Sequence, residues 1–186
     1  MAYVGLAKPA VATLKDETAK TYTDAFYCGK AVQIDVSPQY AEGSLYGDNT
    51  KAEYDKEFKY ADVTLQTTTL PIKAHNLMFG HTVTETEGKQ AVKFKDSDDA
   101  PYVGLGFIVT EKVDGKRKYV ASWLYKVKFA EGSETYKTKG DNIEYQTPNI
   151  SGQAMALPDG DWKDVEMFDT EAEAVTWLEE KAGKAA

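Results

Sequence analysis

The sequence predicts a mainly β-sheet domain with one short flanking helix and one C-terminal helix. Three observations lead to this fold class. Apolar residues alternate along residues 101–129, an Asp-Gly pair interrupts that alternation, and helix start and stop signals occur near residues 71–80 and 170–183. Alternation with a period of two is typical of a strand. With 186 residues the chain is long enough to bury a core without staples, so we expect a single domain over 1–186.

The first half of the chain predicts strands separated by polar segments. Residues 3–36 carry β-forming residues with a polar interruption at 15–20, which predicts short strands joined by a turn. Residues 37–56 are polar and rich in turn-forming residues, so we expect a long loop with little burial there. Strand character returns at 58–69, where Val63 and Leu65 alternate with polar neighbours.

A short helix is predicted next. Pro71 suits the first turn of a helix, an apolar run occupies residues 72–79, and Gly80 stands just past the expected end. A tight turn at 87–89 then precedes a predicted strand around 92–95.

Residues 101–129 predict a long β-hairpin, which we call the central hairpin. Asp114-Gly115 favours a two-residue type I′ turn, because both positions need positive φ. Such a turn sets Val113 opposite Lys116 and, by counting, Trp123 opposite Gly106 and Tyr125 opposite Gly104. Strict alternation places Trp123, Tyr125, Val127 and Phe129 on one face and Leu124, Lys126 and Lys128 on the other. The residues expected to build this part of the sheet are Val103, Leu105, Phe107, Trp123, Leu124, Tyr125 and Val127.

The remaining segments predict a second hairpin and a terminal helix. The hairpin is expected over 134–150, with its turn at 140–142 and Pro148 marking an edge, an end or a bulge. From about residue 158 onward we expect an acidic C-terminal extension with a helix at 171–182. Thr170 and Glu173 have the spacing of a capping box at its start, and Gly183 ends it.

Composition narrows the classes of function. Thirty acidic and 22 basic side chains give a net charge of −8, which argues against tight nucleic-acid binding, because phosphate affinity comes largely from clustered Lys and Arg. The single Cys28 and an N-terminus without signal-peptide features predict synthesis in the cytoplasm. No apolar stretch approaches the roughly 20 residues that a membrane-spanning helix needs, so we expect no membrane partner.

No recognisable motif for catalysis, cofactor binding or metal binding occurs. His75 and His81 are the only histidines and form no zinc pattern, so we interpret them as ordinary helix-end or surface residues. Residues 96–99 carry three aspartates, but they lack the glycine and glutamate of a calcium loop and favour a solvated turn. Cys28 is interpreted as a small buried apolar residue. We therefore predict no enzyme activity, no cofactor and no metal.

Six strings occur in order along about residues 3–152. They are Tyr3-Val4-Gly5-Leu6 with Pro9, Leu45-Tyr46-Gly47-Asp48-Asn49, Leu70-Pro71 with Phe79-Gly80-His81, Asp99-Ala100-Pro101-Tyr102-Val103-Gly104-Leu105-Gly106-Phe107, Trp123-Leu124-Tyr125-Lys126-Val127-Lys128-Phe129 and Thr138-Lys139-Gly140-Asp141-Asn142-Ile143-Glu144-Tyr145-Gln146-Thr147-Pro148. Together they resemble the major tail proteins that build the tail tube of long-tailed bacteriophages.

This resemblance implies a β-sandwich or barrel-like tail-tube fold, a structural role in the virion tail and assembly into hexameric rings that stack into a tube. Each subunit would lend strands to a shared inner barrel, and genomic DNA would pass through the lumen without specific binding. The implied partners are other copies of the chain and the tape-measure, tail-terminator and tail-tip proteins. The predicted loop at 37–56 would then contact a neighbouring ring, and its candidate contact residues are Tyr40, Leu45, Tyr46, Asp48 and Asn49.

One alternative from a different class stays open. The 12 tyrosines and three tryptophans are numerous enough for a stacking platform, as in a monomeric β-sandwich that binds carbohydrate or peptide. A hydrolase is less well supported, because no nucleophile and base can be paired.

Overall fold

The computed structural model describes residues 2–132, 136, 138 and 147–184. Strands dominate it, which confirms the predicted mainly-β class. The elements are β1 (Ala2–Asp16), β2 (Thr21–Tyr27), β3 (Ala31–Gly47), β4 (Thr50–Thr67), α1 (Ile72–Phe79), β5 (Thr82–Thr86), β6 (Lys89–Lys93), β7 (Val103–Val113), β8 (Lys116–Ala130), β9 (Asn149–Met155), β10 (Lys163–Phe168) and α2 (Glu171–Lys181). Eight strands form one antiparallel sheet in the order β2-β1-β7-β8-β9-β4-β3, with β10 also paired to β8. A separate two-stranded sheet joins β5 and β6.

The central hairpin is β7 and β8, and its turn is as predicted. Asp114 and Gly115 have φ of 49° and 81°, Val113 pairs with Lys116, and Trp123 pairs with Gly106. Between Leu105 and the start of β7 the predicted register is wrong. A bulge there places one extra residue in β8, so that Val103 pairs with Val127.

The bulge also changes which face the end of β8 presents. Trp123 and Tyr125 belong to one hydrophobic core, whereas Val127 and Phe129 belong to the other, together with Leu124. The predicted common face of Trp123, Tyr125, Val127 and Phe129 is therefore wrong. An extra residue reverses the alternation of every side chain that follows it.

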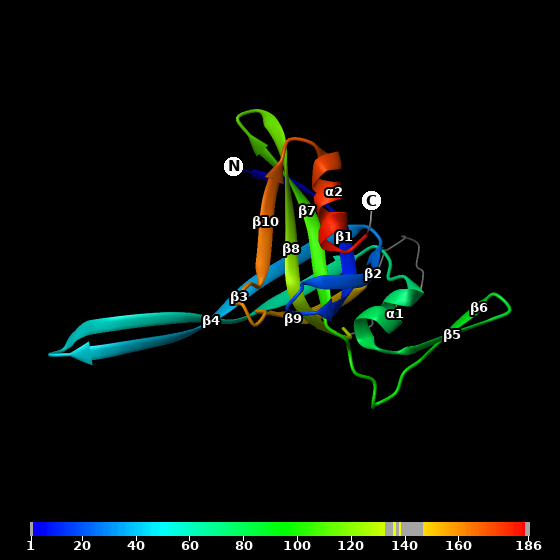
Figure 1. Ribbon diagram of the computed structural model, residues 1–186, viewed down its shortest axis with the longest axis horizontal. Helices are drawn as coiled ribbons and strands as arrows, with labels where there is room; N and C mark the ends of the chain where they lie inside the picture. The colour runs from blue at the N-terminus through cyan, green and yellow to red at the C-terminus, as the bar shows by residue number, and fades with distance from the viewer. Residues whose placement is uncertain (1, 133–135, 137, 139–146, 185–186) are drawn as a thin grey trace.

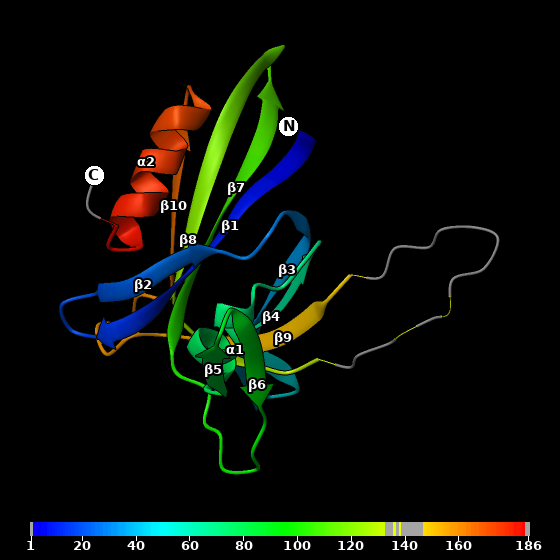
Figure 2. The same cartoon turned by 90° about the vertical axis from the view of Figure 1, so that its right-hand side faces the viewer.

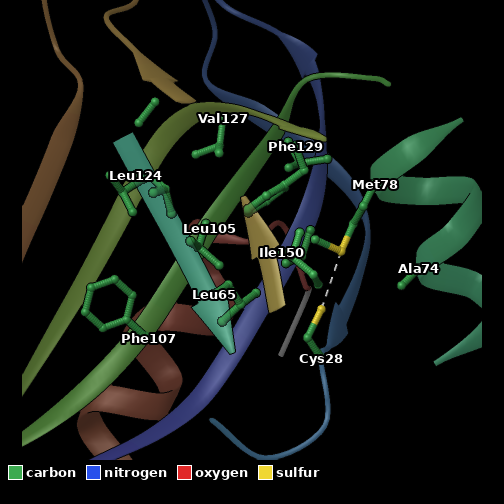
Figure 3. Packing of buried hydrophobic residues seen from close by; sticks show 14 of the residues in the cluster. Cys28, Leu65, Ala74, Met78, Leu105, Phe107, Leu124, Val127, Phe129 and Ile150 are labelled. Atoms are coloured by element: carbon green, nitrogen blue, oxygen red, sulfur yellow. Dashed lines mark hydrogen bonds between the residues drawn. The ribbon is translucent and has the colours of Figure 1, made fainter. Parts of the chain in front are cut away.

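The first core, which we call the inner core, lies between two halves of the same sheet. β7 and β8 contribute one wall, and β4 and β9 contribute the facing wall, with α1 closing one end. Figure 3 shows Leu65, Leu105 and Ile150 converging there, with Cys28 Sγ 3.6 Å from Met78 Sδ. Cys28 is buried as expected, and burial raises the pKa of its thiol to about 12.

The second core, which we call the helix-side core, lies on the opposite face of β7 and β8. There α2 packs Ala174 and Leu178 against the sheet, around the fully buried Trp123. Figure 2 shows α2 along one side of the β7–β8 wall, with α1, β4 and β9 on the other side. The middle of the sheet is thus covered on both faces.

α1 begins and ends where the sequence predicts, whereas α2 begins at the predicted Glu171 and ends at Lys181, one residue before the predicted end. Gly80 ends α1 in the left-handed conformation with φ of 78°. The Thr170 side chain accepts a hydrogen bond from the backbone N–H of Glu173, and the Glu173 side chain accepts one from the backbone N–H of Thr170, so the capping box is complete. None of the helices in the described part of the chain is long and apolar enough to cross a membrane.

The predicted loop at 37–56 is wrong in its secondary structure. β3 and β4 pair along their whole length as one long hairpin, and Asp48 and Asn49 form its turn with φ of 48° and 62°. Both faces of the outer part are exposed, so its sequence lacks the apolar alternation that reveals a half-buried strand. Most of the second predicted hairpin, 134–150, falls outside the described residues; β9 begins at Asn149.

Candidate functional site

The outer half of the β3–β4 hairpin lies outside both hydrophobic cores and is the candidate contact site. We call residues 40–57 the arm. β4 pairs with β9 only from Ala61 to Gln66, so within the described part of the chain the arm has no third strand beside it. Every side chain described in the arm is exposed. Figure 1 shows the arm projecting far from the body of the molecule.

Cross-strand pairs hold the arm together. Glu42 lies opposite Lys56, and their side chains form an ion pair of 3.1 Å. The Lys56 ammonium also lies 4.2 Å from the ring centre of Tyr40, and Lys51 lies 3.9 Å from that of Tyr54. The hydrogen bond from Lys56 holds the pKa of Glu42 below its usual value. These contacts keep an otherwise unsupported ribbon in register.

The root of the arm is fixed to the body by aromatic packing. Phe58 stacks on Trp162 with ring centres 4.7 Å apart, and Tyr40 meets the edge of Phe58 at 6.1 Å. Register shifts next to Tyr40 and Tyr46 each leave an extra residue in β4. Bulges bend and twist a ribbon. The arm is therefore anchored at one end and free at the other.

All five residues predicted from the sequence as inter-ring contacts lie on this arm. Tyr40 is at the root, Leu45 and Tyr46 are near the tip, and Asp48 with Asn49 forms the turn. By the alternation of β3, Tyr40 and Tyr46 share one face, and the pairing of Ser44 with Tyr54 places Tyr54 on that face too. Tyr54 is not among the contact residues predicted from the sequence. It is identified by its pairing with Ser44 across the hairpin.

The arm exposes large apolar side chains, although most of its residues are polar. Leu45 and Tyr46 are 61% and 67% exposed. The arm also carries five acidic and two basic side chains. An apolar tip on an acidic ribbon is suited to a partner surface that offers both an apolar depression and positive charge.

The sheet has free edges among the described strands. β2 and β3 end the strand order, and β10 pairs only with β8. Exposed apolar side chains lie along two of these strands: Val32 on β3, and Val165 and Met167 on β10. Free strand edges pair readily with other chains.

The central hairpin supplies core rather than surface. Val103, Leu105, Phe107, Trp123, Leu124, Tyr125 and Val127 are all buried. β7 lies between β1 and β8, and β8 lies between β7 and its partners β9 and β10. Strand pairing between subunits would therefore run through the open edges, which among the described residues include β2, β3 and β10, the outer part of β4 and the part of β1 before Ala10.

A second surface feature is a hollow of about 280 Å³ beside α2. Tyr22, Tyr125 and Trp177 line it together with Lys20, Glu180 and Lys181. Its two lysines are already paired: Lys20 lies 2.6 Å from Asp161, and Lys181 lies 2.6 Å from Asp164. The hollow is aromatic, and its positive charge is locally neutralised.

The sequence matches no protein-family model and no curated protein.

Proposed function

We propose that this chain is a tail-tube subunit of a long-tailed bacteriophage, a structural virion protein whose hexameric rings stack into the tube that conducts DNA into the host cell. The observation that carries the proposal is the arm: an ordered ribbon, acidic along its length and apolar at its tip, that lies outside the core of its own subunit. The resemblance of residues 3–152 to tail-tube proteins gives the arm its expected partner, a subunit of the adjacent ring.

Physical chemistry supports an assembled state for such a ribbon. An isolated two-stranded hairpin is marginally stable in water. A neighbouring subunit that covers the tyrosine face of the arm would bury Tyr46 and Tyr54 and so add the support that the body of the monomer does not provide. Exposed apolar side chains that cluster in this way commonly mark contact sites between proteins.

The free edges of β2, β3 and β10 support ring formation. Closed cyclic symmetry pairs each edge with a neighbour and removes the hazard of uncontrolled strand pairing. Because a ring presents complementary upper and lower faces, rings can stack without a fixed limit. Tail length would then be set by a partner such as the tape-measure protein.

The net charge of −8 supports a conduit for DNA. A negatively charged wall repels phosphate, so DNA would slide through the lumen without being held. The proposal includes no enzyme activity and no cofactor.

A second candidate function is a monomeric module that binds carbohydrate or peptide. The hollow lined by Tyr22, Tyr125 and Trp177 favours it, because aromatic faces stack on sugar rings and apolar side chains. Trp123 cannot contribute to such a site, since it is fully buried.

Negative-stain electron microscopy of the purified, concentrated chain separates these candidates. A tail-tube subunit gives rings or hollow tubes of uniform width. A chain that stays monomeric at every concentration, and binds a sugar or peptide at the Trp177 hollow, would support the binding module and overturn the tube.

A further inference from the structure

The end of α1 brings both histidines of the chain to one place. The left-handed Gly80 reverses the chain, so that the backbone N–H of His81 donates to the carbonyl of His75 at 2.9 Å. The Asn76 side chain donates to the carbonyl of His81, also at 2.9 Å. The two imidazole rings consequently lie 6.1 Å apart between centres.

The turn at 96–99 lies directly over this helix end. A Cβ at Gly80 would come within 2.2 Å of the Asp99 carbonyl oxygen, so only glycine permits the approach. This places the Asp98 carboxylate 2.7 Å from His81 Nδ1 and 2.9 Å from the backbone N–H of Lys95, which donates to it.

A third segment completes the cluster. Glu131, directly after β8, places its Oε1 2.7 Å from His81 Nε2. His81 is therefore buried between two carboxylates: it lies at a helix end, as predicted, but its interpretation as a surface residue is wrong. Phe94 covers the ring of His81 with centres 4.4 Å apart and limits access from one side.

We propose that His75, His81 and Glu131 form a binding site for a divalent transition-metal ion, with Zn²⁺ as the best fit. One ligand atom from each residue lies within 4.8 Å of the others. Zinc ligands about 2.0–2.2 Å from a tetrahedral ion lie roughly 3.3–3.6 Å apart. Small side-chain rotations thus convert the cluster into three ligands, while water fills the fourth position.

Asp98 supplies the outer support that such sites use. A histidine that binds a metal through Nε2 commonly donates its Nδ1 proton to a carboxylate, which orients the ring and increases its basicity. The 2.7 Å contact between His81 Nδ1 and Asp98 has this geometry. Two imidazoles and one carboxylate suit zinc better than magnesium or calcium, which prefer oxygen ligands alone.

The bound ion would connect three segments that are separate in sequence: α1, the turn at 96–99 through Asp98, and the end of β8. It would fasten α1 over the end of the inner core. Sequence spacing gives no sign of this, because Glu131 lies fifty residues after His81. The inference does not depend on the proposed tube function.

Isothermal titration calorimetry tests the site: zinc chloride is titrated into the full chain after all metal has been removed from it. We expect one zinc ion to bind per chain. The variants His75→Gln and Glu131→Gln should each weaken the affinity for zinc at least tenfold. Glu17→Gln is the matched control: it removes a carboxylate 2.6 Å from Lys126, away from the cluster, and should leave zinc binding unchanged. Absence of saturable binding, or equal affinity in wild type and His75→Gln, would overturn the proposal.

Two further readouts distinguish a ligand from a merely structural residue. Co²⁺ in the wild type should give the visible absorption bands of a tetrahedral site, and His75→Gln should lose them. Added zinc should raise the melting temperature of the wild type, because an ion that binds only the folded state stabilises it. Circular dichroism of each variant in metal-free buffer establishes that it folds, and a folded His75→Gln chain with unchanged cobalt bands would contradict the site.

Discussion

At the scale of single residues, Trp123 shows why two glycines are needed in β7. Its ring lies across both, so that a Cβ at Gly104 or Gly106 would come within 2.3 or 2.5 Å of the ring. Leu178 of α2 lies on the same face, and its side chain would be 2.4 Å from the Cβ at Gly106. The sheet, the ring and the helix therefore meet at a position where only a hydrogen atom fits.

Gly106→Ala is expected to destabilise the monomer. An added methyl group in a filled core forces neighbours to shift and typically costs about 1–3 kcal/mol. The free energy of unfolding from denaturant titration measures the loss. Gly43→Ala in the arm is the control, because a Cβ there meets nothing within 4 Å and should change stability by less than about 0.5 kcal/mol. Equal stabilities for the two variants would contradict the packing described.

A charged cluster beside α2 predicts a pH effect. Asp164 lies 2.6 Å from the Lys181 ammonium and also accepts from the Tyr125 hydroxyl at 3.2 Å. The hydrogen bond from Lys181 holds the pKa of Asp164 below its usual value. A carboxyl whose pKa is lowered by folding stabilises the folded state above its unfolded pKa of about 3.9, and this contribution disappears as the pH falls through the folded pKa.

Asp164→Asn should therefore lower the free energy of unfolding at pH 7 by about 0.5–1 kcal/mol, a modest value because both side chains are partly exposed to solvent. The difference from wild type should shrink below about pH 4, which denaturant titrations at several pH values can follow. Asp48→Asn is the control in an exposed turn where asparagine also tolerates positive φ. A difference that persists unchanged at low pH would contradict the role of this carboxylate.

At the scale of elements, the sequence predicts an element correctly where it has a buried apolar face or a local turn or cap signal. Asp114-Gly115 and the Thr170–Glu173 box are local signals, and both elements form as predicted. The bulge in β8 depends on contacts with β7 and β9, so no local signal revealed it. The sequence of the arm predicts a loop because the arm is held by cross-strand pairing and has no buried apolar face.

Removing the capping box of α2 is expected to lower the stability of the folded chain measurably. Thr170→Ala removes the acceptor for the Glu173 N–H and should cost about 1 kcal/mol in the free energy of unfolding. Thr176→Ala, on the exposed side of the same helix, is the matched control. Its hydroxyl donates to the Ala172 carbonyl of its own helix, so alanine should be neutral or slightly stabilising. If both variants lost the same stability, the cap would not be the cause.

The arm predicts an effect on assembly without an effect on folding. The double variant Leu45→Asp with Tyr46→Asp replaces two exposed apolar side chains by like charges on an acidic ribbon. We expect the body of the monomer to unfold with nearly the same free energy, because the arm lies outside both cores, but we expect assembly to need at least a tenfold higher concentration, which corresponds to about 1.4 kcal/mol. Pelleting assays over a concentration series measure it.

Ile72→Asp provides the control for that experiment, because Ile72 is 37% exposed and lies on α1, away from the arm and from the free strand edges. Assembly that responds to the arm variant and not to Ile72→Asp would locate the contact in the arm. An arm variant that assembles as well as the wild type would remove the arm from the interface.

At the scale of the whole molecule, one folded sheet encloses the inner core, and α2 covers the second core on its outer face. The sequence predicted the mainly-β class and both helices, because strand alternation and helix caps are local. It did not predict the curvature of the sheet or the position of the arm outside the body. It also missed the meeting of His75, His81 and Glu131, which depends on contacts between distant segments.

The central claim is that the chain assembles with copies of itself through the arm and the free strand edges. Sedimentation velocity of the full chain over a hundredfold concentration range tests it most directly. The account predicts that the 20.6-kDa monomer gives way to hexamers and then to larger species as concentration rises. A single monomeric boundary at every concentration would contradict it.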